Sequence, residues 1–501
     1  MTDPAPTAGR LGTGCGPLDA ILGGGLPARS VTVVAGAPGT GKTVLTLQML
    51  FHHARQGKKC LYFSTLSEPA LKTIHYMQAF SFFDTSLLEE RLRFVDLGSI
   101  LRDGEPEKAL GPLIDRVESE GADLVVIDSF KAIHDLLPGR DGGRKFVYDL
   151  AVAMAAWGAT TLLVGEYTAE EIGTAPEFAI ADGIVELFNE RQELTAVRQF
   201  EVLKLRGTSY VTGRHFFEIG AAGLRVYPRV RGPAVTDDPP VDLADRVGTG
   251  VPGLDALLLG GLPRASATIV EGGTGAGKSL VGLHFLLEGV RGGEPGILFT
   301  LEETPAQVRA IAGSFGWPVA LHEAQDRLVI HYTSPVELLT DRFLDEALGL
   351  IAKVGARRVV LDGLTSMALG VGSPRRFREL VYALTKHVRA AGATLLMTME
   401  VAELLGTAQL TGHGISSIAD NLIVLRYVEV QGHLGRAVLV LKARGIGHTT
   451  ELRRFLIDDR GAHVGEPFKD LRGVLTGIPQ PERAAGRPAG PGTTGKKRRG
   501  R

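Results

Sequence analysis

Hydrophobic residues in this chain gather in short β-rich runs separated by longer stretches of helical periodicity, and the same succession of runs occurs twice. Buried strands are predicted in the first half at Val31–Ala35, Cys60–Ser64, Leu124–Ile127 and Thr161–Val164. Their counterparts in the second half are Thr268–Val270, Ile297–Thr300, Val359–Leu361 and Thr394–Met397. Because parallel strands need crossover helices between them, this alternation predicts an α/β fold with a mainly parallel sheet flanked by helices.

Each half finishes with two β-like runs that follow one another without a helix between them. In the second half these runs are Asn421–Val430 and Arg436–Lys442, and a turn separates them. Strands joined in this way pair antiparallel, so we expect an antiparallel extension at one side of each sheet.

An internal repeat sets the domain organisation. The stretch at 11–19 (LGTGCGPLD) returns at 247–255 (VGTGVPGLD), and a Gly-Gly-Leu-Pro turn follows each copy. A lysine in a glycine-rich loop also recurs, at Lys42 and Lys278, which lie 236 residues apart (278 − 42). A period of this length indicates duplicated whole domains rather than a solenoid of short units.

We therefore expect a first domain at 8–229, a linker at 230–245 and a second domain at 246–477. The linker contains several prolines and little apolar periodicity. The remaining residues, 478–501, are rich in Pro, Gly and Ala, end in Gly-Lys-Lys-Arg-Arg-Gly-Arg and are predicted to be a disordered basic tail. Such a tail either solubilises the chain or serves as a docking segment for a regulatory protein.

A glycine-rich loop lies between the first predicted strand of each half and the following helical stretch, as GAPGTGKT at 36–43 and GGTGAGKS at 272–279. Both match GxxxxGK[ST], in which backbone N–H groups and a helix N-terminus face phosphate oxygens and the lysine neutralises the β- and γ-phosphates. The predicted ATP-contacting residues are Gly36, Gly39, Thr40, Gly41, Lys42 and Thr43 in the first half and Gly272, Thr274, Gly275, Ala276, Gly277, Lys278 and Ser279 in the second. A glycine-rich turn with a surface lysine would explain one match, but two matches at equivalent repeat positions argue against it.

Four residues are predicted to hold magnesium. The hydroxyls of Thr43 and Ser279 follow the loop lysines, where such a group binds Mg²⁺. Asp128 and Asp362 each end an apolar run, which places a carboxylate at the carboxyl end of a strand beside the loop. An aspartate that merely opens a turn is the alternative, and the upstream loop favours the metal. ATP and Mg²⁺ are therefore the predicted cofactors.

Further acidic residues follow another predicted strand of each half. The second half has Glu302 and Glu303, whereas the first has Ser67 and Glu68. A carboxylate here could polarise an attacking water or hydroxyl, which serine cannot do as a base at neutral pH. Without the repeat, an acidic turn that opens a solvated helix would be the simpler interpretation.

Composition restricts the remaining function classes. The chain has a net charge of −1, 44% hydrophobic and 22% charged residues, which is typical of a soluble globular protein and gives no overall attraction for nucleic acid. The first residues lack the pattern of a signal peptide and no apolar run is long enough to cross a bilayer, so we expect a cytoplasmic protein without membrane contact. The two cysteines and 13 histidines show no metal-binding spacing.

The GTG lead-in, the paired glutamates and the segment Lys204-Leu-Arg-Gly-Thr together resemble the KaiC-like circadian-clock ATPases of the RecA/DnaB group, over about residues 10–470. The resemblance implies two tandem RecA-like P-loop NTPase domains and homo-hexameric rings with ATP held between neighbouring subunits. It also implies that certain cations reach into the neighbour's site and offset charge on the γ-phosphoryl group. These cations are Lys204 and Arg206 in the first half and Lys442 and Arg444 in the second. Without the resemblance, an exposed basic strand end would be the default interpretation.

The same resemblance implies roles for acidic and hydroxyl residues. Glu302, the first glutamate of the pair, would be the base, and Ser67 in its place implies that the first domain binds ATP but hydrolyses it slowly. The family's autophosphorylated pair of adjacent hydroxyl residues corresponds to Ser416 and Ser417, and the first half has no acceptor there. A nearby threonine of the clock members is Ala419 here, which argues against an ordered phosphorylation cycle.

The sequence thus favours an ATP-hydrolysing protein with serine autophosphorylation in the second domain, acting as a hexameric signalling or timing ATPase. A RecA/DnaB-like DNA-dependent ATPase is the alternative, because fold does not fix function. The near-neutral charge and the lack of an evident basic, aromatic-interleaved loop count against it. A third hypothesis is a binding module in which the nucleotide only holds the hexamer together.

Overall fold

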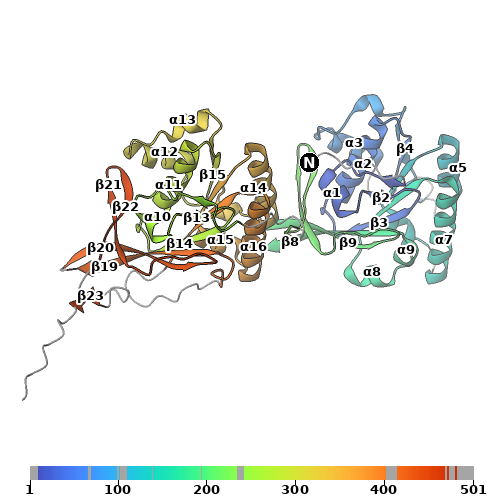
Figure 1. Ribbon diagram of the computed structural model, residues 1–501. Helices are drawn as coiled ribbons and strands as arrows, with labels where there is room; N and C mark the ends of the chain where they lie inside the picture. Colours follow the sequence, from blue (N-terminus) through green and yellow to red (C-terminus); the bar gives the residue numbers. More distant parts are fainter. Residues whose placement is uncertain are drawn as a thin grey trace, which may run out of the picture. The chain divides into compact units, whose positions relative to one another are not determined.

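The computed structural model describes residues 9–65, 69–98, 101, 110–137, 139–192, 195–233, 242–401, 414–430, 432–468, 471–472 and 480–481. The chain divides into two compact units, Met1–Arg229 and Val230–Arg501 (Figure 1). Each unit contains a nine-stranded sheet that is mostly parallel and has helices on both faces. The predicted fold class, two tandem α/β domains with an antiparallel extension of the sheet, is confirmed.

The sheet of the first unit has the strand order β11-β10-β9-β8-β3-β7-β6-β4-β5. Its strands are β3 (Val31–Gly36), β4 (Cys60–Ser64), β5 (Leu92–Asp96), β6 (Leu124–Asp128), β7 (Thr160–Gly165), β8 (Gly183–Gln192), β9 (Thr195–Leu205), β10 (Arg214–Gly220) and β11 (Gly223–Tyr227). Strands β3 to β8 pair in parallel, and β8 to β11 pair antiparallel in succession. The helices are α1 (Gly16–Ile21), α2 (Lys42–Arg55), α3 (Ala70–Met77), α5 (Leu110–Glu120), α6 (Phe130–His134), α7 (Gly139–Trp157), α8 (Ala169–Thr174) and α9 (Pro176–Ile180).

The second unit repeats this plan in the strand order β16-β15-β17-β18-β14-β19-β20-β21-β22. Its strands are β14 (Ala267–Gly272), β15 (Gly296–Thr300), β16 (Leu328–Tyr332), β17 (Arg358–Asp362), β18 (Thr394–Glu400), β19 (Asn421–Val430), β20 (His433–Ala443), β21 (Arg453–Asp458) and β22 (Gly461–Pro467). The helices are α10 (Leu254–Leu257), α11 (Lys278–Arg291), α12 (Pro305–Ser314), α13 (Val319–Ala324), α14 (Thr340–Val354), α15 (Leu364–Val371) and α16 (Pro374–Ala390). Corresponding strands therefore occupy corresponding places in the two sheets, as whole-domain duplication requires.

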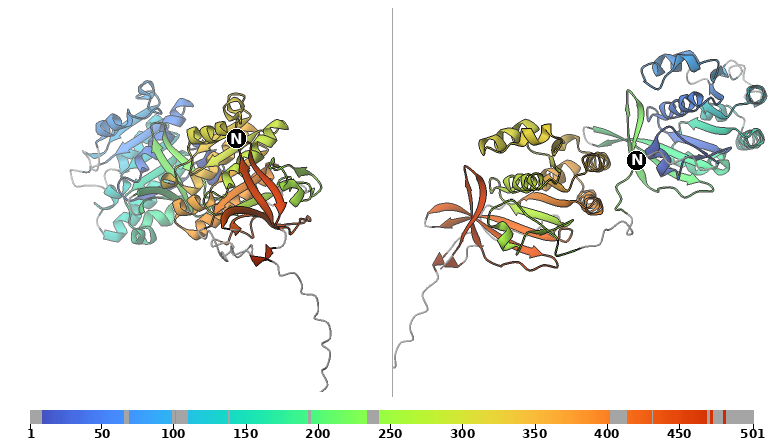
Figure 2. Two further views of the ribbon diagram at one scale, coloured as in Figure 1. Left: turned by 90° about the vertical axis from the view of Figure 1, so that its left-hand side faces the viewer. Right: turned by 45° about the horizontal axis from the view of Figure 1, so that its top comes forward.

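Both faces of the parallel strands are buried, which explains why their sequences are continuously hydrophobic. In the second unit, Ile269 of β14 packs in the core beneath α14–α16, whereas the next residue, Val270, packs in the core beneath α11–α13. Figure 2 shows these two helix groups on their separate sides of the sheet. The first unit has the same two cores.

The lead-in repeat has a structural explanation. The Asp19 carboxylate accepts the backbone N–H of Thr13 at 2.7 Å, and Asp255 accepts that of Thr249 at 2.9 Å. The strand that opens each lead-in pairs with the Leu-Pro strand after the double glycine, as β1 (Arg10–Leu11) with β2 (Leu26–Pro27) and β12 (Arg246–Val247) with β13 (Leu262–Pro263). The motif therefore closes a small loop at the entrance to each domain.

The linker and the tail differ in part from the expectation. The Val230 N–H donates to the buried Asp341 carboxylate of α14 at 2.6 Å, so the predicted linker begins as part of the second unit. Gln480–Pro481 in the predicted tail forms a short strand, β24, that pairs with β23 (Leu471–Arg472). Residues 234–241 of the linker and 482–501 of the tail lie outside the described residues.

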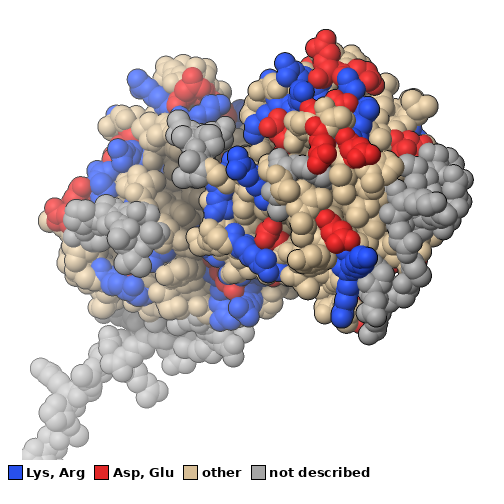
Figure 3. Space-filling model, turned by 90° about the vertical axis from the view of Figure 1, so that its right-hand side faces the viewer, with Lys and Arg blue, Asp and Glu red and all other residues tan. Residues whose placement is uncertain are grey.

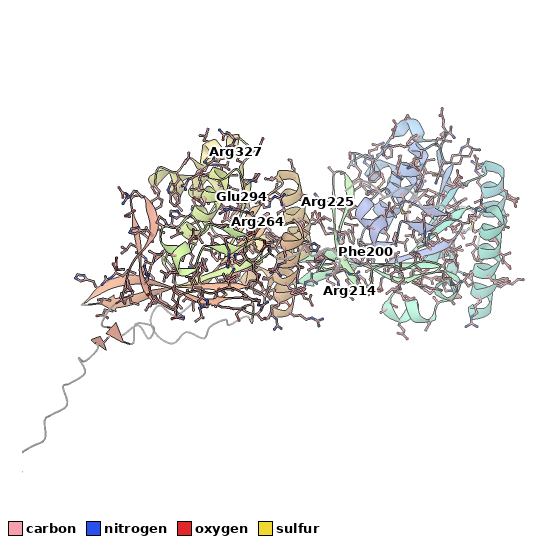
Figure 4. All side chains as sticks on the ribbon, in the orientation of Figure 1. Phe200, Arg214, Arg225, Arg264, Glu294 and Arg327 are labelled. Atoms are coloured by element: carbon pink, nitrogen blue, oxygen red, sulfur yellow. The ribbon has the colours of Figure 1, made fainter. Side chains whose placement is uncertain are left out.

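A network of charged side chains, built around the buried Arg358, attaches the end of the linker to the second sheet. Arg264 donates to Asp245 at 2.8 Å and to Glu294 at 2.6 Å, and Figure 4 labels Arg264 and Glu294. Arg358 of β17 donates to the second oxygen of Glu294 at 2.7 Å and to the Gly248 carbonyl at 2.7 Å. Since Arg358 is only 5% exposed, Glu294 is needed to balance a charge that water cannot reach.

Helix α11 carries a buried histidine that holds the last hairpin. The ring nitrogen Nε2 of His284 accepts the Ala462 N–H of β22 at 3.0 Å. In the first unit, Gln48 occupies the equivalent place on α2, and its Oε1 accepts the Leu224 N–H at 2.7 Å. Burial, with a smaller effect of Arg291, lowers the pKa of His284 from 6.5 to about 4. The histidine therefore stays neutral and remains an acceptor at physiological pH.

We predict that acidification destabilises the second unit through His284. Its pKa is lower in the folded chain than in the unfolded chain, so its stabilisation is complete above about pH 6.5 and is lost as the pH falls through about 4. Lowering the pH from about 7.5 to about 5 should reduce the free energy of unfolding by up to about 2 kcal/mol through this residue. Urea unfolding at the two pH values measures the change.

The variant His284→Gln is the matched control, because Gln48 already makes the same contact in the first unit. It should unfold within about 1 kcal/mol of the parent at the higher pH and lose this part of the acid sensitivity. An unchanged acid sensitivity in His284→Gln would contradict the assignment.

Candidate nucleotide-binding sites

A glycine-rich loop joins the central strand of each unit to the following helix. Helix α2 begins at Lys42 and α11 at Lys278, directly after Gly41 and Gly277, whose φ angles are 103° and 105°. A Cβ on Gly41 would lie 2.6 Å from Ile219 Cδ1. Only glycine adopts this φ readily and also has no Cβ to clash with Ile219. The resulting turn directs the free N–H groups of the helix N-terminus into the loop. Each loop is thus a cradle for an anion.

The loop lysines bind carbonyl groups of their own loops. The Lys42 ammonium donates to the Gly36 and Ala37 carbonyls at 2.9 and 2.8 Å, and Lys278 donates to the Gly273 carbonyl at 2.9 Å. Burial lowers the pKa of both lysines, while nearby carboxylates act in the opposite direction. An anionic ligand would replace neutral carbonyl partners with a charged one, which favours binding at this point.

The other predicted loop residues act through the backbone or through contacts inside the site. Thr40 is fully buried and its hydroxyl donates to the Ala37 carbonyl at 2.9 Å, so its side chain shapes the loop. Thr274 is exposed and donates to Glu400 at 2.5 Å. Ala276 is buried in the core, and Gly39 and Gly275 adopt φ angles of 73° and 72°. These residues leave only their N–H groups for a ligand.

The residues predicted to hold magnesium come together in the first unit. The Thr43 hydroxyl donates to Asp128 at 2.8 Å, and the Tyr62 hydroxyl donates to the same oxygen at 3.0 Å. In the second unit, Asp362 is buried and accepts a hydrogen bond from Thr398, while Ser279 begins α11 beside Lys278. Among the described residues, no cluster of three or more His, Cys, Asp or Glu could bind a metal alone. One hydroxyl and one carboxylate fit Mg²⁺ that is bound together with phosphate oxygens.

A cavity of about 730 Å³ opens over the first glycine-rich loop. Its lining includes Gly39, Gly41, Lys42, Thr43 and Asp128. The cavity thus brings the anion cradle and the candidate metal ligands to one space of a size that suits a nucleotide.

Sequence reasoning missed one acidic residue in each site. Glu166 lines the first cavity and its charge acts on Lys42, and Glu400 acts in the same way on Lys278. Glu166 directly follows β7 and Glu400 is the last residue of β18, the strands that pair with β3 and β14. The two residues lie 234 residues apart (400 − 166), the same period that separates Asp128 from Asp362 (362 − 128). A complete self-comparison of acidic positions would have found them.

The paired glutamates lie beside Asp362 in the second unit. Glu302 accepts the Ser366 hydroxyl at 2.7 Å, and a Cβ on Gly363 would come within 2.9 Å of its carboxylate. Burial raises the pKa of Glu303, and the charges of Asp362 and Glu302 raise it further. Three carboxylates are therefore concentrated at the carboxyl end of β15 and β17, where a water or hydroxyl could be activated.

In the first unit, Ser67 and Glu68 lie outside the described residues. The Thr65 N–H donates to the Asp128 carbonyl as the Leu301 N–H does to the Asp362 carbonyl, so these two residues are structurally equivalent. Since α3 begins at Ala70 and α12 at Pro305, the loop of the first unit is one residue longer. Ser67 therefore corresponds to Glu302 when residues are counted back from the first residue of the following helix. The two do not correspond when residues are counted forward from the preceding strand.

The basic residues predicted to act in a neighbouring subunit's site lie near the amino ends of the parallel strands. The glycine-rich loop lies at the carboxyl ends of these strands. Lys442 donates to the Ser416 and Ala419 carbonyls at 2.9 and 2.6 Å, and Arg444 donates to the Ser417 carbonyl at 3.3 Å. Strand β20 brings them beside Asn421, which pairs with Thr268 near the beginning of β14, whereas the loop follows the end of β14. The six residues of β14 separate the two edges by on the order of 17 Å.

The first unit has the same arrangement. Lys204 donates to the Phe178 and Ala179 carbonyls at 3.3 Å each, and Arg206 donates to Asp182 at 3.3 Å. These contacts lie where β8 begins, again away from the loop that follows β3. Lys204, Arg206, Lys442 and Arg444 thus lie away from the glycine-rich loop of their own domain. Another basic residue of β20, Arg436, does reach the second loop and donates to the Gly275 carbonyl at 3.2 Å.

The candidate phosphate acceptors share this edge. Ser417 is exposed and its hydroxyl donates to the Gly414 carbonyl at 3.4 Å, and Ser416 is half-buried. The segment is held by Lys442 and Arg444 through its carbonyl groups, which leaves the side chains of the two serines on the domain's edge. Residues 402–413, which precede it, lie outside the described residues.

Comparison with known proteins identifies the architecture. A family model described as KaiC ATPase matches residues 11–231 and 247–469. The circadian clock oscillator protein KaiC of Picosynechococcus sp. is 30% identical over 473 residues, which cover 92% of this chain and 90% of that protein. The circadian clock protein KaiC3 of Synechocystis sp. is 30% identical over 486 residues and 94% of both chains, and KaiC of Prochlorococcus marinus is 29% identical over 481 residues, 94% of this chain and 95% of that protein. With both glycine-rich loops in place and both halves matched, the chain belongs to the KaiC family of ATPases and consists of two tandem RecA-like domains.

Proposed function

We propose that this protein is a magnesium-dependent ATPase that assembles as a homo-hexamer and transfers phosphate to its own serines in the second domain. Its relatives carry the names of circadian clock proteins, and a signalling or timing role for this chain follows from that likeness. One observation supports the assembly most directly. In each domain the phosphate cradle and the basic segment lie at opposite edges of one sheet, so a complete site needs two subunits.

A head-to-tail ring satisfies this geometry. The cradle edge of one domain would face the basic edge of the same domain in the next subunit, and the rotation would close after a fixed number of copies. Lys442 and Arg444 of the neighbouring subunit would then offset charge on the γ-phosphoryl group, as an arginine finger does. Ser416 and Ser417 would enter the same interface, because their segment is bound to these two cations.

Within the second domain, each residue has a defined task. Bound Mg·ATP would supply the transferable phosphoryl group. The loop N–H groups and Lys278 would bind its phosphates, and Ser279 and Asp362 would hold the metal. Glu302, oriented by the Ser366 hydroxyl, would accept the proton of the attacking water or serine, with Glu303 beside it as the carboxyl whose pKa is raised.

The face of the molecule shown in Figure 3 gives no support to a DNA-dependent ATPase. On the face shown in Figure 3, basic and acidic side chains are interspersed among the described residues, whereas DNA binding needs a continuous basic stripe. No helix in the described part of the chain combines the length and the apolar character that crossing a bilayer requires.

We predict that the two domains contribute unequally to ATP turnover. Lys278→Ala should remove most of the steady-state ATPase rate, whereas Lys42→Ala should remove the smaller part, because only the second domain has both glutamates. The rate of ADP release by each variant measures this division.

Glu302→Gln provides the control for chemistry as opposed to binding. It should lower the turnover of the second domain by about 10²-fold or more while equilibrium binding of ATP is retained. A larger loss of turnover from Lys42→Ala than from Lys278→Ala would overturn the proposed division.

We further predict phosphorylation of Ser416 or Ser417 after incubation with Mg·ATP. Intact-mass analysis should show the added phosphoryl group in the parent chain and not in the double variant Ser416→Ala/Ser417→Ala. Ser314→Ala, an exposed serine at the end of α12, is the matched control and should be phosphorylated like the parent. An unmodified parent chain under conditions of active ATP turnover would contradict autophosphorylation.

A further inference from the structure

The lining of the first nucleotide site includes two lysines outside the glycine-rich-loop pattern, Lys72 and Lys131. Lys131 belongs to α6, three residues after Asp128, and lines the same cavity as Lys42 and Thr43. Its side chain is 16% exposed. A Cβ on Gly165 would lie 3.0 Å from the Cβ of Lys131, so the stem of the lysine runs past the strand end that leads to Glu166. Lys131 therefore stands on the Asp128 and Glu166 side of the cavity.

Two carboxylates hold the Lys131 ammonium. It donates to Asp135 at 2.5 Å and forms an ion pair with Glu171 at 3.1 Å, and it lies 5.9 Å from the centre of the Tyr167 ring. Burial alone would lower the pKa of Lys131, but Asp135 and Glu171 together raise it above its ordinary value. The group is thus charged, oriented and only partly solvated. An ammonium has three N–H donors, so one remains for a ligand in the cavity.

The second unit has no equivalent cation. The period that relates Asp128 to Asp362 places Thr365 where Lys131 stands in the first unit. The Thr365 hydroxyl donates to the Glu400 carbonyl at 3.2 Å and accepts the Glu400 N–H at 3.0 Å, so it connects α15 to β18. The two sites of this chain therefore differ at this position, which in the first unit lines the same cavity as the candidate metal ligands.

We propose that Lys131 binds the terminal phosphate of ATP in the first domain and makes that site selective for ATP over ADP. The inference rests on the proposed function, because it assumes that the first loop binds a nucleotide. The loop amides would bind the phosphates nearest the helix and Lys42 the β- and γ-phosphates, whereas Asp128 marks the metal and the terminal phosphoryl group. A cation that lines the same cavity as Asp128 would meet a phosphate that ADP does not have. Asp135 and Glu171 hold the ammonium at the cavity and, as anions, compete with the phosphate for it.

The effect of Glu171 on Lys131 can be separated from its structural role in capping α8. Glu171 is the third residue of α8 and forms a capping box with Thr168. Gln307 makes the same capping box with Thr304 at the beginning of α12. Glu171→Gln should therefore preserve the helix while it removes one carboxylate that competes with phosphate for Lys131.

The test is nucleotide affinity in a chain whose second loop is disabled by Lys278→Ala, measured by equilibrium titration with Mg·ATP and with Mg·ADP. Lys131→Met, which keeps a stem of similar length, should weaken ATP binding by about 10-fold and leave ADP binding within about twofold. Lys131→Arg keeps the charge and the ion pairs, and should retain most of the preference for ATP. Glu171→Gln should tighten ATP binding by a few-fold without a change for ADP.

Each outcome decides between the alternatives. Equal weakening of ATP and ADP by Lys131→Met, or no weakening of either, would show that Lys131 has only a structural role and would overturn the inference while the proposed ATPase stands. A fall in ATP affinity with Glu171→Gln would overturn it as well, and this variant keeps Lys131 in place if Lys131→Met fails to fold. A Lys278→Ala chain that binds neither nucleotide would overturn the proposed function itself, and the inference with it.

Discussion

The direction of the parallel strands governs the chemistry of this protein. Because the central strands of each sheet are parallel, the loops that follow their carboxyl ends all lie on the same side of the domain. The glycine-rich loop, Asp362 and Glu302 are brought together there. The antiparallel hairpin returns in the opposite direction and leaves Lys442 and Arg444 at the other edge. No side-chain rearrangement can span the length of β14, so a site that uses both groups has to combine two copies of the domain, which we propose come from neighbouring subunits.

Duplication gave two copies of one scaffold, and the differences between the copies indicate different work. Both copies keep the same structural features. In each, an aspartate closes the lead-in loop, a glycine with a positive φ precedes the helix after the glycine-rich loop, and a polar side chain on that helix binds the last hairpin. The chemical parts diverge, since the second domain has Glu302 and Glu303 and the first has Lys131. A first site suited to holding ATP and a second suited to turning it over is the division that these substitutions support.

Much of this organisation could be predicted from the sequence, because glycine-rich loops, apolar runs and a long repeat are local signals. The strands β4 and β19 match their predicted bounds, and the Thr43 hydroxyl donates to Asp128. Glu166 and Glu400 belong to no local motif, and the only signal for them is the 234-residue period that they share with Asp128 and Asp362. Lys131 follows Asp128 closely but has no counterpart in the second half, so the repeat does not mark it. The attachment of Val230 to Asp341 was missed for the same reason, since a proline-rich stretch gives no sign of a partner about a hundred residues away.

The central claim, that the second site is shared between subunits, is tested most directly by complementation. Chains with Lys278→Ala lack the cradle and chains with Arg444→Ala lack the donated cation, and each preparation alone should have little turnover in the second domain. Co-expressed in equal amounts, they should recover up to about a quarter of the parent rate, the share of interfaces in which an intact cradle faces an intact arginine. Turnover no greater than the mean of the two separate variants would show that both groups act within one chain, which would contradict the account.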